Sequence, residues 1–129
     1  MTLDVVRGWY EALEADDVPS AIALCSPEVE VRYPAAGRLP YGGAWKGLQG
    51  VERWAEAHDS VEEIIEFRTH NPIADGDRAA VPGFFRGRSR QTGREWETWF
   101  VHVLRVREGR LVGFEAHFDT AAAVEAHHA

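Results

Sequence analysis

The sequence predicts an α+β fold in which helices cover one face of a mainly antiparallel sheet. Most of residues 2–58 have hydrophobic residues at helical spacing, and one segment among them alternates between apolar and polar residues. Four segments rich in β-branched and aromatic residues follow up to Asp119, separated by short turn sequences. Consecutive strands joined by short turns pair antiparallel. A strongly twisted sheet of this kind wraps over the helices and leaves a small-molecule pocket at its open end.

A chain of 129 residues predicts one domain, residues 1–129, with one hydrophobic core. The formal net charge of −7 argues against nucleic acid as a partner. Cys25 is the only cysteine, which excludes an internal disulfide and a multi-cysteine metal cluster. No apolar run approaches the ~20 residues that span a bilayer. The sequence also begins without a signal-peptide pattern, so a cytoplasmic location and no membrane partner are expected.

The first 33 residues predict two helices and a strand. Residues 2–15 have helical hydrophobic spacing, and Thr2 is placed to cap them. Asp17 is placed to cap a second helix, which Ser26-Pro27 ends. Residues 28–33 alternate strictly and therefore predict a half-buried strand. Its side chains on one face are Val29, Val31 and Tyr33.

The middle of the chain predicts a long loop, a third helix and two strands. Residues 34–47 are dense in Pro and Gly and hold Tyr41 and Trp45, which is typical of a functional rim or lid. A helix is predicted from Gln49 to His58, with Trp54 inward. Strands are predicted over 64–73 and 78–88, the second bent or bulged at Pro82-Gly83. Residues 121–127 predict a short helix or tail, with His127 and His128 disordered.

The last predicted hairpin, Trp96–Asp119, carries His102 on an apolar stripe, and its register decides which residues share that face. A two-residue Glu108-Gly109 loop places His102 beside Glu115, His117 and Asp119. A three-residue loop with Gly109 left-handed is favoured, because Glu108 does not suit a primed turn. The face of His102 then holds Trp96, Thr98, Phe100, Leu104, Val112, Phe114, Ala116 and Phe118. The opposite face of the hairpin holds Leu111, Glu115, His117 and Asp119. We expect this face on the outside of the sheet, so no metal site is expected there.

Five segments of the chain resemble a known family. They are Trp9–Asp17, Leu39–Val51, Phe100–Val103, Arg107–Leu111 and Phe118–Thr120. In their order and spacing they resemble the SnoaL-like branch of the nuclear transport factor 2-like (NTF2-like) superfamily, whose cone fold is shared with ketosteroid isomerase. The resemblance implies a curved, mainly antiparallel sheet wrapped around three helices with an internal pocket. It also implies a pocket without a cofactor and a homodimer through the outer sheet face. It implies no single reaction, because this fold hosts many chemistries.

The resemblance also implies roles for particular residues. Tyr10 resembles the helix tyrosine that ketosteroid isomerases use to hold an enolate oxygen. His102 lies near their second oxyanion donor and resembles the strand histidine of SnoaL-type cyclases. Two positions depart from the family: Tyr33 stands where the isomerases have an aspartate base, and Ala116 where the cyclases have an inward acid. Groups that polarise a carbonyl are therefore present, and the usual proton-abstracting carboxylate is not.

These observations predict a catalytic set of His102, Tyr10 and Tyr33 in an apolar pocket. The predicted substrate-binding residues are Trp54, Trp96, Thr98, Phe100, Phe114, Phe118, Tyr41 and Trp45. The predicted function is a cofactor-independent isomerase, cyclase or dehydratase that acts on a polyketide-, terpenoid- or steroid-like carbonyl compound. The alternative is a non-catalytic ligand binder or dimeric accessory protein, in which His102 and Tyr10 are core residues and Tyr33 only closes a strand end.

Overall fold

The computed structural model describes residues 1–128 and contains four helices and seven strands there. The helices are α1 (Thr2–Glu14), α2 (Val18–Ala23), α3 (Gly47–Val61) and α4 (Thr120–His127). The strands are β1 (Cys25–Tyr33), β2 (Gly43–Lys46), β3 (Glu62–Thr69), β4 (Ile73–Asp75), β5 (Arg78–Ser89), β6 (Glu95–Arg107) and β7 (Arg110–His117). The expected α+β class is confirmed.

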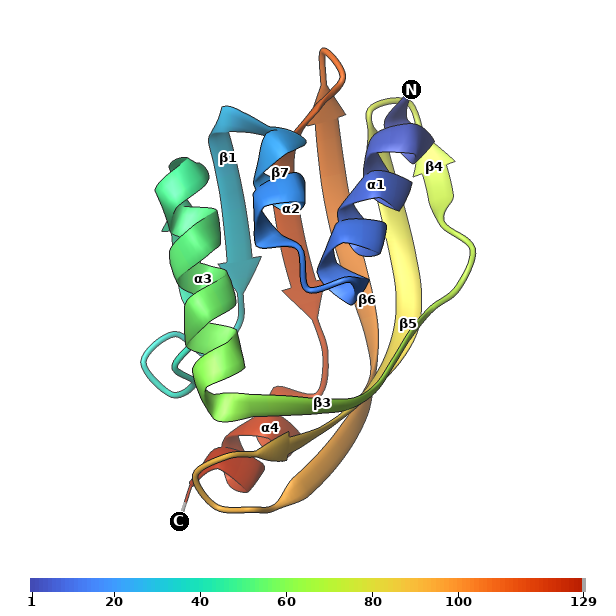
Figure 1. Cartoon of the computed structure of the whole chain (residues 1–129). Helices are drawn as coiled ribbons and strands as arrows, with labels where there is room; N and C mark the ends of the chain where they lie inside the picture. Colours follow the sequence, from blue (N-terminus) through green and yellow to red (C-terminus); the bar gives the residue numbers. More distant parts are fainter. Residues whose placement is uncertain (129) are drawn as a thin grey trace.

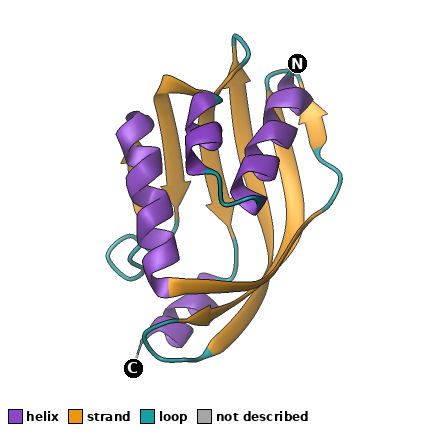
Figure 2. Ribbon diagram, in the orientation of Figure 1, coloured by secondary structure: helices purple, strands orange, loops and turns teal. Residues whose placement is uncertain are grey.

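All seven strands belong to one curved sheet in the order β2-β1-β7-β6-β5-β3, and β4 pairs with β5. Every pairing is antiparallel except that of β1 with β7. Helices α1, α2 and α3 lie on the same side of this sheet (Figures 1 and 2). Helix α4 lies at one end and contacts β5 and β6. The expected arrangement, a curved sheet wrapped around three helices, is therefore present.

The β6–β7 hairpin has a different turn from the expected one but keeps the expected face for His102. Arg107 pairs with Arg110, so the loop is the two residues Glu108 and Gly109, both with positive φ. A register shift follows, because Val106 pairs with Leu111 while Arg105 pairs with Gly113. The extra residue in β7 turns the rest of the strand over.

That shift decides which β7 residues are buried. His102 pairs with Ala116 and Leu104 with Phe114, and all four side chains are buried. The expected positions of Leu111 and Val112 were wrong, because the bulge at residue 112 buries Leu111.

Several boundaries also differ from the expected ones. The loop over 34–47 contains β2, which pairs with β1. Cys25 begins β1 and does not end α2. The expected strand 64–73 is divided into β3, which begins at Glu62, and the separate β4. Met1, and not Thr2, is the N-cap of α1.

Strand β5 does not bulge at Pro82-Gly83, because it pairs with β6 without a register shift from Arg78 to Arg88. Gly83 instead makes room for a neighbouring ring. A Cβ there would lie 2.3 Å from Phe100 Cζ and 2.3 Å from the Arg68 carbonyl oxygen. The glycine therefore lets Phe100 lie flat against β5 on the concave side of the sheet.

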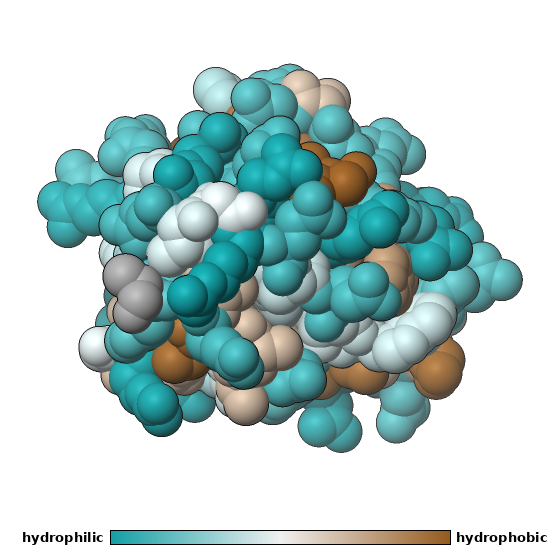
Figure 3. All heavy atoms as spheres, turned by 90° about the horizontal axis from the view of Figure 1, so that it is seen from below, coloured by the Kyte–Doolittle hydropathy of each residue, from teal (hydrophilic) through white to brown (hydrophobic). Residues whose placement is uncertain are grey.

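Apolar residues of α1 and α3 and the concave sheet face form one buried core, with Trp9 and Leu104 fully buried. Seen from below, the molecular surface is largely hydrophilic, with small, separate hydrophobic areas (Figure 3). Among the described residues, none of the helices has both the length and the apolar character needed to cross a membrane.

Candidate functional site

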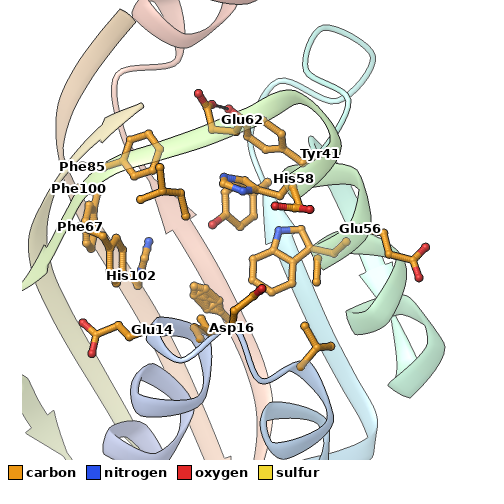
Figure 4. A pocket seen from close by; sticks show the side chains of 18 of the residues that line it. Glu14, Asp16, Tyr41, Glu56, His58, Glu62, Phe67, Phe85, Phe100 and His102 are labelled. Carbon is orange, nitrogen blue, oxygen red and sulfur yellow. Dashed lines mark hydrogen bonds between the residues drawn. The ribbon is translucent and has the colours of Figure 1, made fainter. Parts of the chain in front are cut away.

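A cavity of about 1160 Å³ lies between the concave sheet face and the helices. Its walls are mostly aromatic, and polar side chains project into it from α3, β3 and β6 (Figure 4). A volume of this size takes a drug-sized organic molecule. The aromatic lining residues are Tyr33, Tyr41, Trp54, Phe67, Phe85, Trp96, Phe100, Phe114 and Phe118.

The entrance of the cavity carries negative charge. Side chains of the α1–α2 connection and of α3 line it together with the cavity wall. The carboxylates among the lining residues, apart from the buried Glu62, are Glu14, Asp16, Asp17, Glu52, Glu56 and Asp59. Arg90 also lines it, and its guanidinium lies 3.6 Å from Asp59. The cavity walls are mostly aromatic, so these six carboxylates lie where water reaches them, and Glu62 is the exception among the described lining residues.

His102 projects from β6 into the cavity and is held by Tyr10 of α1. The Tyr10 hydroxyl lies 2.8 Å from Nδ1 of His102, and both residues are buried. The two rings are parallel, with an interplanar angle of 5°. Phe100 stacks on a face of the imidazole at 4.2 Å, and Phe114 packs edge-on at 4.6 Å. The imidazole therefore has one fixed orientation.

Burial keeps the His102 imidazole neutral. Loss of hydration, together with the charge of His117, lowers the pKa of His102 from 6.5 to about 3. Burial and the nearby Tyr33 raise the pKa of Tyr10, so its phenol keeps its proton. Both groups are uncharged over the whole physiological pH range.

The hydrogen bond between these two neutral groups decides which ring nitrogen carries the His102 proton. Among the described residues, the Tyr10 hydroxyl has Nδ1 as its one partner. With the proton on Nδ1, the buried hydroxyl hydrogen would have no acceptor, which costs about 1–3 kcal/mol. The favoured tautomer therefore has Tyr10 O–H donating to Nδ1 and the histidine proton on Nε2. Nε2 has no partner in the described chain and is open to the cavity.

Tyr33 lies at the end of β1 and also lines the cavity. Its ring centroid is 6.2 Å from that of Phe114, which in turn contacts His102. Its hydroxyl has no hydrogen-bond partner in the described part of the chain and is accessible. Burial raises the pKa of Tyr33, so this phenol is a second neutral donor that faces the cavity.

The structure brings together most of the expected binding residues. Seven of them line the cavity: Trp54, Trp96, Thr98, Phe100, Phe114, Phe118 and Tyr41. Trp45 does not, and its expected position in a lid was wrong. It lies in β2, where pairing with β1 holds it, and its indole N–H donates to the Tyr41 carbonyl oxygen at 3.1 Å. Tyr10 lies behind His102 and not on the cavity wall.

The acidic residues near the last strand do not supply a base. Ala116 faces inward as expected and lies opposite His102, and its methyl side chain cannot act as an acid or a base. The Asp119 carboxylate caps α4 by accepting from the Ala122 N–H at 3.1 Å. Glu115 and His117 bond to one another at 2.8 Å on the exposed face.

A second polar cluster closes the other side of the cavity around Glu62, the first residue of β3. Its carboxylate is fully buried and accepts from the Tyr41 hydroxyl and the Trp96 indole N–H, each at 3.0 Å. His127 of α4 contributes a third bond, with Nε2 2.8 Å from Oε1. A Cβ on Gly87 would lie 2.7 Å from Oε2, so this glycine makes room for the carboxylate.

His58, in the last turn of α3, stands beside that cluster and lines the cavity (Figure 4). Its ring centroid lies 4.6 Å from that of Tyr41 and 6.4 Å from that of Tyr33. Loss of hydration lowers the pKa of His58 to about 4, against the opposing effect of Glu62. In the described chain neither ring nitrogen has a hydrogen-bond partner, and both are accessible.

The sequence profile of the SnoaL-like domain family matches residues 6–114 of this chain. The chain belongs to the SnoaL-like family. An NTF2-like protein of unknown function from Burkholderia pseudomallei is 31% identical over 99% of this chain and 98% of its own, with a TM-score of 0.88. A search of curated proteins finds no match to the chain.

More distant solved structures share the fold of this SnoaL-like protein. TerC, crystallised with polyporic acid, is 24% identical, covers 97% of this chain and 96% of its own, and has a TM-score of 0.86. A protein with a ketosteroid isomerase-like fold from Catenulispora acidiphila, in complex with trimethylamine, is 13% identical. It covers 95% of this chain and 90% of its own, with a TM-score of 0.79. The expected cone fold is therefore confirmed.

Sequence reasoning missed Glu62, His127 and His58 in this SnoaL-like chain. Glu62 is one of two consecutive glutamates at a helix–strand junction, and nothing in that pattern separates a buried carboxylate from an exposed one. His127 was expected in a disordered tail, but it is buried in α4, because its bond to Glu62 holds the helix end inward. The available signal was helical spacing: His58 lies four residues after the inward Trp54.

Proposed function

We propose that this protein is a cofactor-independent isomerase, cyclase or dehydratase that acts on a flat, hydrophobic carbonyl compound such as a polyketide, terpenoid or steroid-like ring system. The observation that carries the proposal is the buried Tyr10–His102 pair, which aims an N–H donor into an aromatic cavity. No bound metal or cofactor is needed for the chemistry proposed, because donors that stabilise an enolate are already in place.

The role of His102 follows from its tautomer. Its Nε2–H donates to the substrate carbonyl oxygen, and this bond strengthens as negative charge develops there. Tyr33, which also presents an unpartnered hydroxyl, is the second donor to that oxygen. Tyr10 holds the imidazole in the donating tautomer and orientation and is a positioning residue. The aromatic walls bind the ring system and exclude water, which strengthens both hydrogen bonds.

A non-catalytic binder is the second candidate, and one observation favours it. Among the described residues, Glu62 is the carboxylate deep in the cavity, and it already accepts three hydrogen bonds, while the inward Ala116 has no acidic group. Such a protein would bind the same hydrophobic ligands without turning them over.

The two candidates are separated by exchange of α-hydrogens into deuterated water, followed by proton NMR on β-tetralone, anthrone and related aromatic ketones. The enzyme reading expects exchange well above the buffer rate, and a loss of about 10²–10³-fold in His102→Ala. His128→Ala is the matched control, because His128 is exposed and lies outside the cavity lining. Binding without exchange across the whole set would support the non-catalytic reading.

We also propose that the outer sheet face is a homodimer contact. Trp99 and Val101 of β6 are 66% and 40% exposed and lie two residues apart, so they share one face of the strand. Phe84 of β5, which is buried, and the exposed His70 after β3 pack against Trp99 with ring centroids 5.0 and 6.1 Å away, so Trp99 has a fixed position on this face.

A further inference from the structure

We propose that His58 is the general base of this site, and that the proton it removes comes from the substrate carbon next to the carbonyl group held by His102. This inference rests on the proposed function and supplies the proton acceptor that the expected acids do not provide. His58 and His102 come from α3 and β6 and lie on different walls of one cavity (Figure 4). A substrate between them contacts both.

His102 cannot perform both roles in its observed hydrogen bond. Its Nδ1 lone pair accepts the Tyr10 proton, and its Nε2 carries a hydrogen. No free lone pair remains on the ring to take a proton from carbon. A donor of this kind stabilises an oxyanion, and the proton acceptor must be a different group.

The carboxylates are also poor candidates. Glu62 is buried and its oxygens already accept from Tyr41, Trp96 and His127. Using one of these oxygens as a base would break bonds that hold α4 against β3. The carboxylates at the entrance are solvated, and Asp17 is engaged as the cap of α2 through bonds to Ser20.

His58, unlike these groups, has a lone pair that is free to accept a proton inside the cavity. Its imidazole is neutral above about pH 4, and both ring nitrogens are open to the cavity. In a neutral imidazole one of these nitrogens carries a lone pair. The ring is fixed between Tyr41 at 4.6 Å and Phe85 at 6.3 Å, so its orientation is set by packing.

The proton transfer balances without any further reactant. The lone pair on a ring nitrogen of His58 takes the proton of the α-carbon, and the C–H electron pair forms the carbon–carbon double bond. The carbonyl π electrons move to oxygen, which becomes an enolate held by the Nε2–H of His102. The imidazolium at His58 forms beside the Glu62 carboxylate, whose negative charge favours it. Return of the proton to the same or a conjugated carbon regenerates the imidazole and gives exchange or isomerisation.

The test uses the full-length protein and β-tetralone, with initial rates of α-hydrogen exchange in deuterated water. In His58→Gln we expect kcat to fall by about 10²–10⁴-fold while KM changes less than about threefold, because the base acts only on the reacting proton. In His58→Ala, added imidazole should restore part of the rate, which a purely structural role would not allow. Near-ultraviolet circular dichroism of both variants confirms that each is folded.

Nitrogen-15 NMR of the histidine rings provides a readout that does not depend on turnover. Wild-type protein and His58→Gln should both show His102 protonated on Nε2, and Tyr10→Phe should lose this preference.

The kcat/KM of the wild type should be constant above about pH 5 and should fall at lower pH, as His58 takes a proton. The titratable groups that face His58 are Glu62, Asp59, His127, Tyr33 and Tyr41, and all five are present in both the wild type and His58→Gln.

The outcomes separate this inference from the proposed function. If the wild type exchanges β-tetralone and His58→Gln does so at a similar rate, the assignment of His58 is overturned and the proposed function stands. A His102 proton on Nδ1 would also overturn it, because His102 would then have the free lone pair. If the wild type accelerates no exchange, the proposed function itself is overturned.

Discussion

Glu62 shows how much depends on a single residue in this protein. It is an acid without solvent access, and it forms three hydrogen bonds, with Tyr41 of the β1–β2 loop, Trp96 of β6 and His127 of α4. A buried charge is tolerated only when such partners are supplied, because losing hydration costs several kcal/mol. The hydrogen-bond partners of Glu62 therefore matter as much for stability as its carboxylate. Removing the carboxylate or its partners leaves buried polar groups without a hydrogen bond.

We expect Glu62→Ala to lower the free energy of unfolding by about 3–5 kcal/mol, because Trp96, Tyr41 and His127 would lose their shared acceptor. Urea denaturation measures this. The control is Glu63→Ala, since Glu63 is the neighbouring, partly exposed acid and only contacts Arg88 at 3.2 Å. That variant should change stability by less than about 1 kcal/mol. Equal losses in the two variants would contradict the structural role of Glu62.

The two cavity histidines make stability depend on pH. Folding lowers the pKa of His102 to about 3 and that of His58 to about 4, from 6.5. Below pH 6.5 the unfolded chain binds protons at both residues and the folded chain does not. The free energy of unfolding should therefore decrease as the pH falls from 6.5 to 4, by about 1.4 kcal/mol per pH unit for each histidine.

Urea denaturation at several pH values between 7 and 4 tests this for His102. The His102→Gln variant should lose its share of the slope and show a shallower pH dependence than the wild type. The exposed control His128→Gln should follow the wild type. Parallel curves for wild type and His102→Gln would show that His102 is not kept neutral by folding.

At the scale of elements, the β6–β7 hairpin combines an unfavourable turn residue with a bulge. Glu108 has φ of 52° and Gly109 has φ of 75°, which is the pattern of a type I′ turn. Glycine adopts this conformation readily, but glutamate does not. The turn and the bulge at Val112 together place Phe114 and Ala116 on the inward face of β7, which is the face that the three-residue loop also predicts. The register itself differs from that prediction, because the residue opposite His102 is Ala116.

Glu108→Asn should therefore stabilise the protein by about 1 kcal/mol, because asparagine tolerates the left-handed region and Asn-Gly is a preferred type I′ pair. Thermal unfolding measures the gain as a rise of a few degrees in Tm. Glu108→Ala is the control, and it should bring no such gain, since alanine does not favour positive φ. An asparagine variant no more stable than the alanine variant would contradict this account of the turn.

At the scale of the whole molecule, sheet curvature has two consequences. On the concave side it separates the sheet from the helices enough to leave the cavity. On the other side it presents Trp99 and Val101 to solvent, and we have proposed that a second copy of the chain covers them. Neither side chain belongs to the buried core between the sheet and the helices.

The dimer proposal predicts that Trp99→Lys shifts the protein from dimer to monomer while leaving the monomer folded. Light scattering after size-exclusion chromatography gives the mass, and circular dichroism checks the fold. Ile73→Lys is a matched control, since Ile73 in β4 is 69% exposed and outside the Trp99 surface. A wild-type protein that is monomeric at high concentration would remove the proposal.

Local patterns in the sequence determined the fold class, most helices and strands, and the inward face of β6. Alternation over Trp96, Thr98, Phe100 and His102 has the two-residue period of a strand, and that period alone places all four on one side. Seven of the eight residues predicted for substrate binding line the cavity, because side chains on an inward face line whatever hollow lies there.

Only the tertiary structure decided the Glu62 cluster, the position of His58 and the pairing of Tyr10 with His102. The partners of Glu62 lie 21, 34 and 65 residues away in the sequence. Periodicity specifies which side of an element a residue faces, but it carries no information about which distant element lies opposite. That depends on the curvature of the sheet, the bulge in β7 and the docking of α4, and these result from packing of the whole chain.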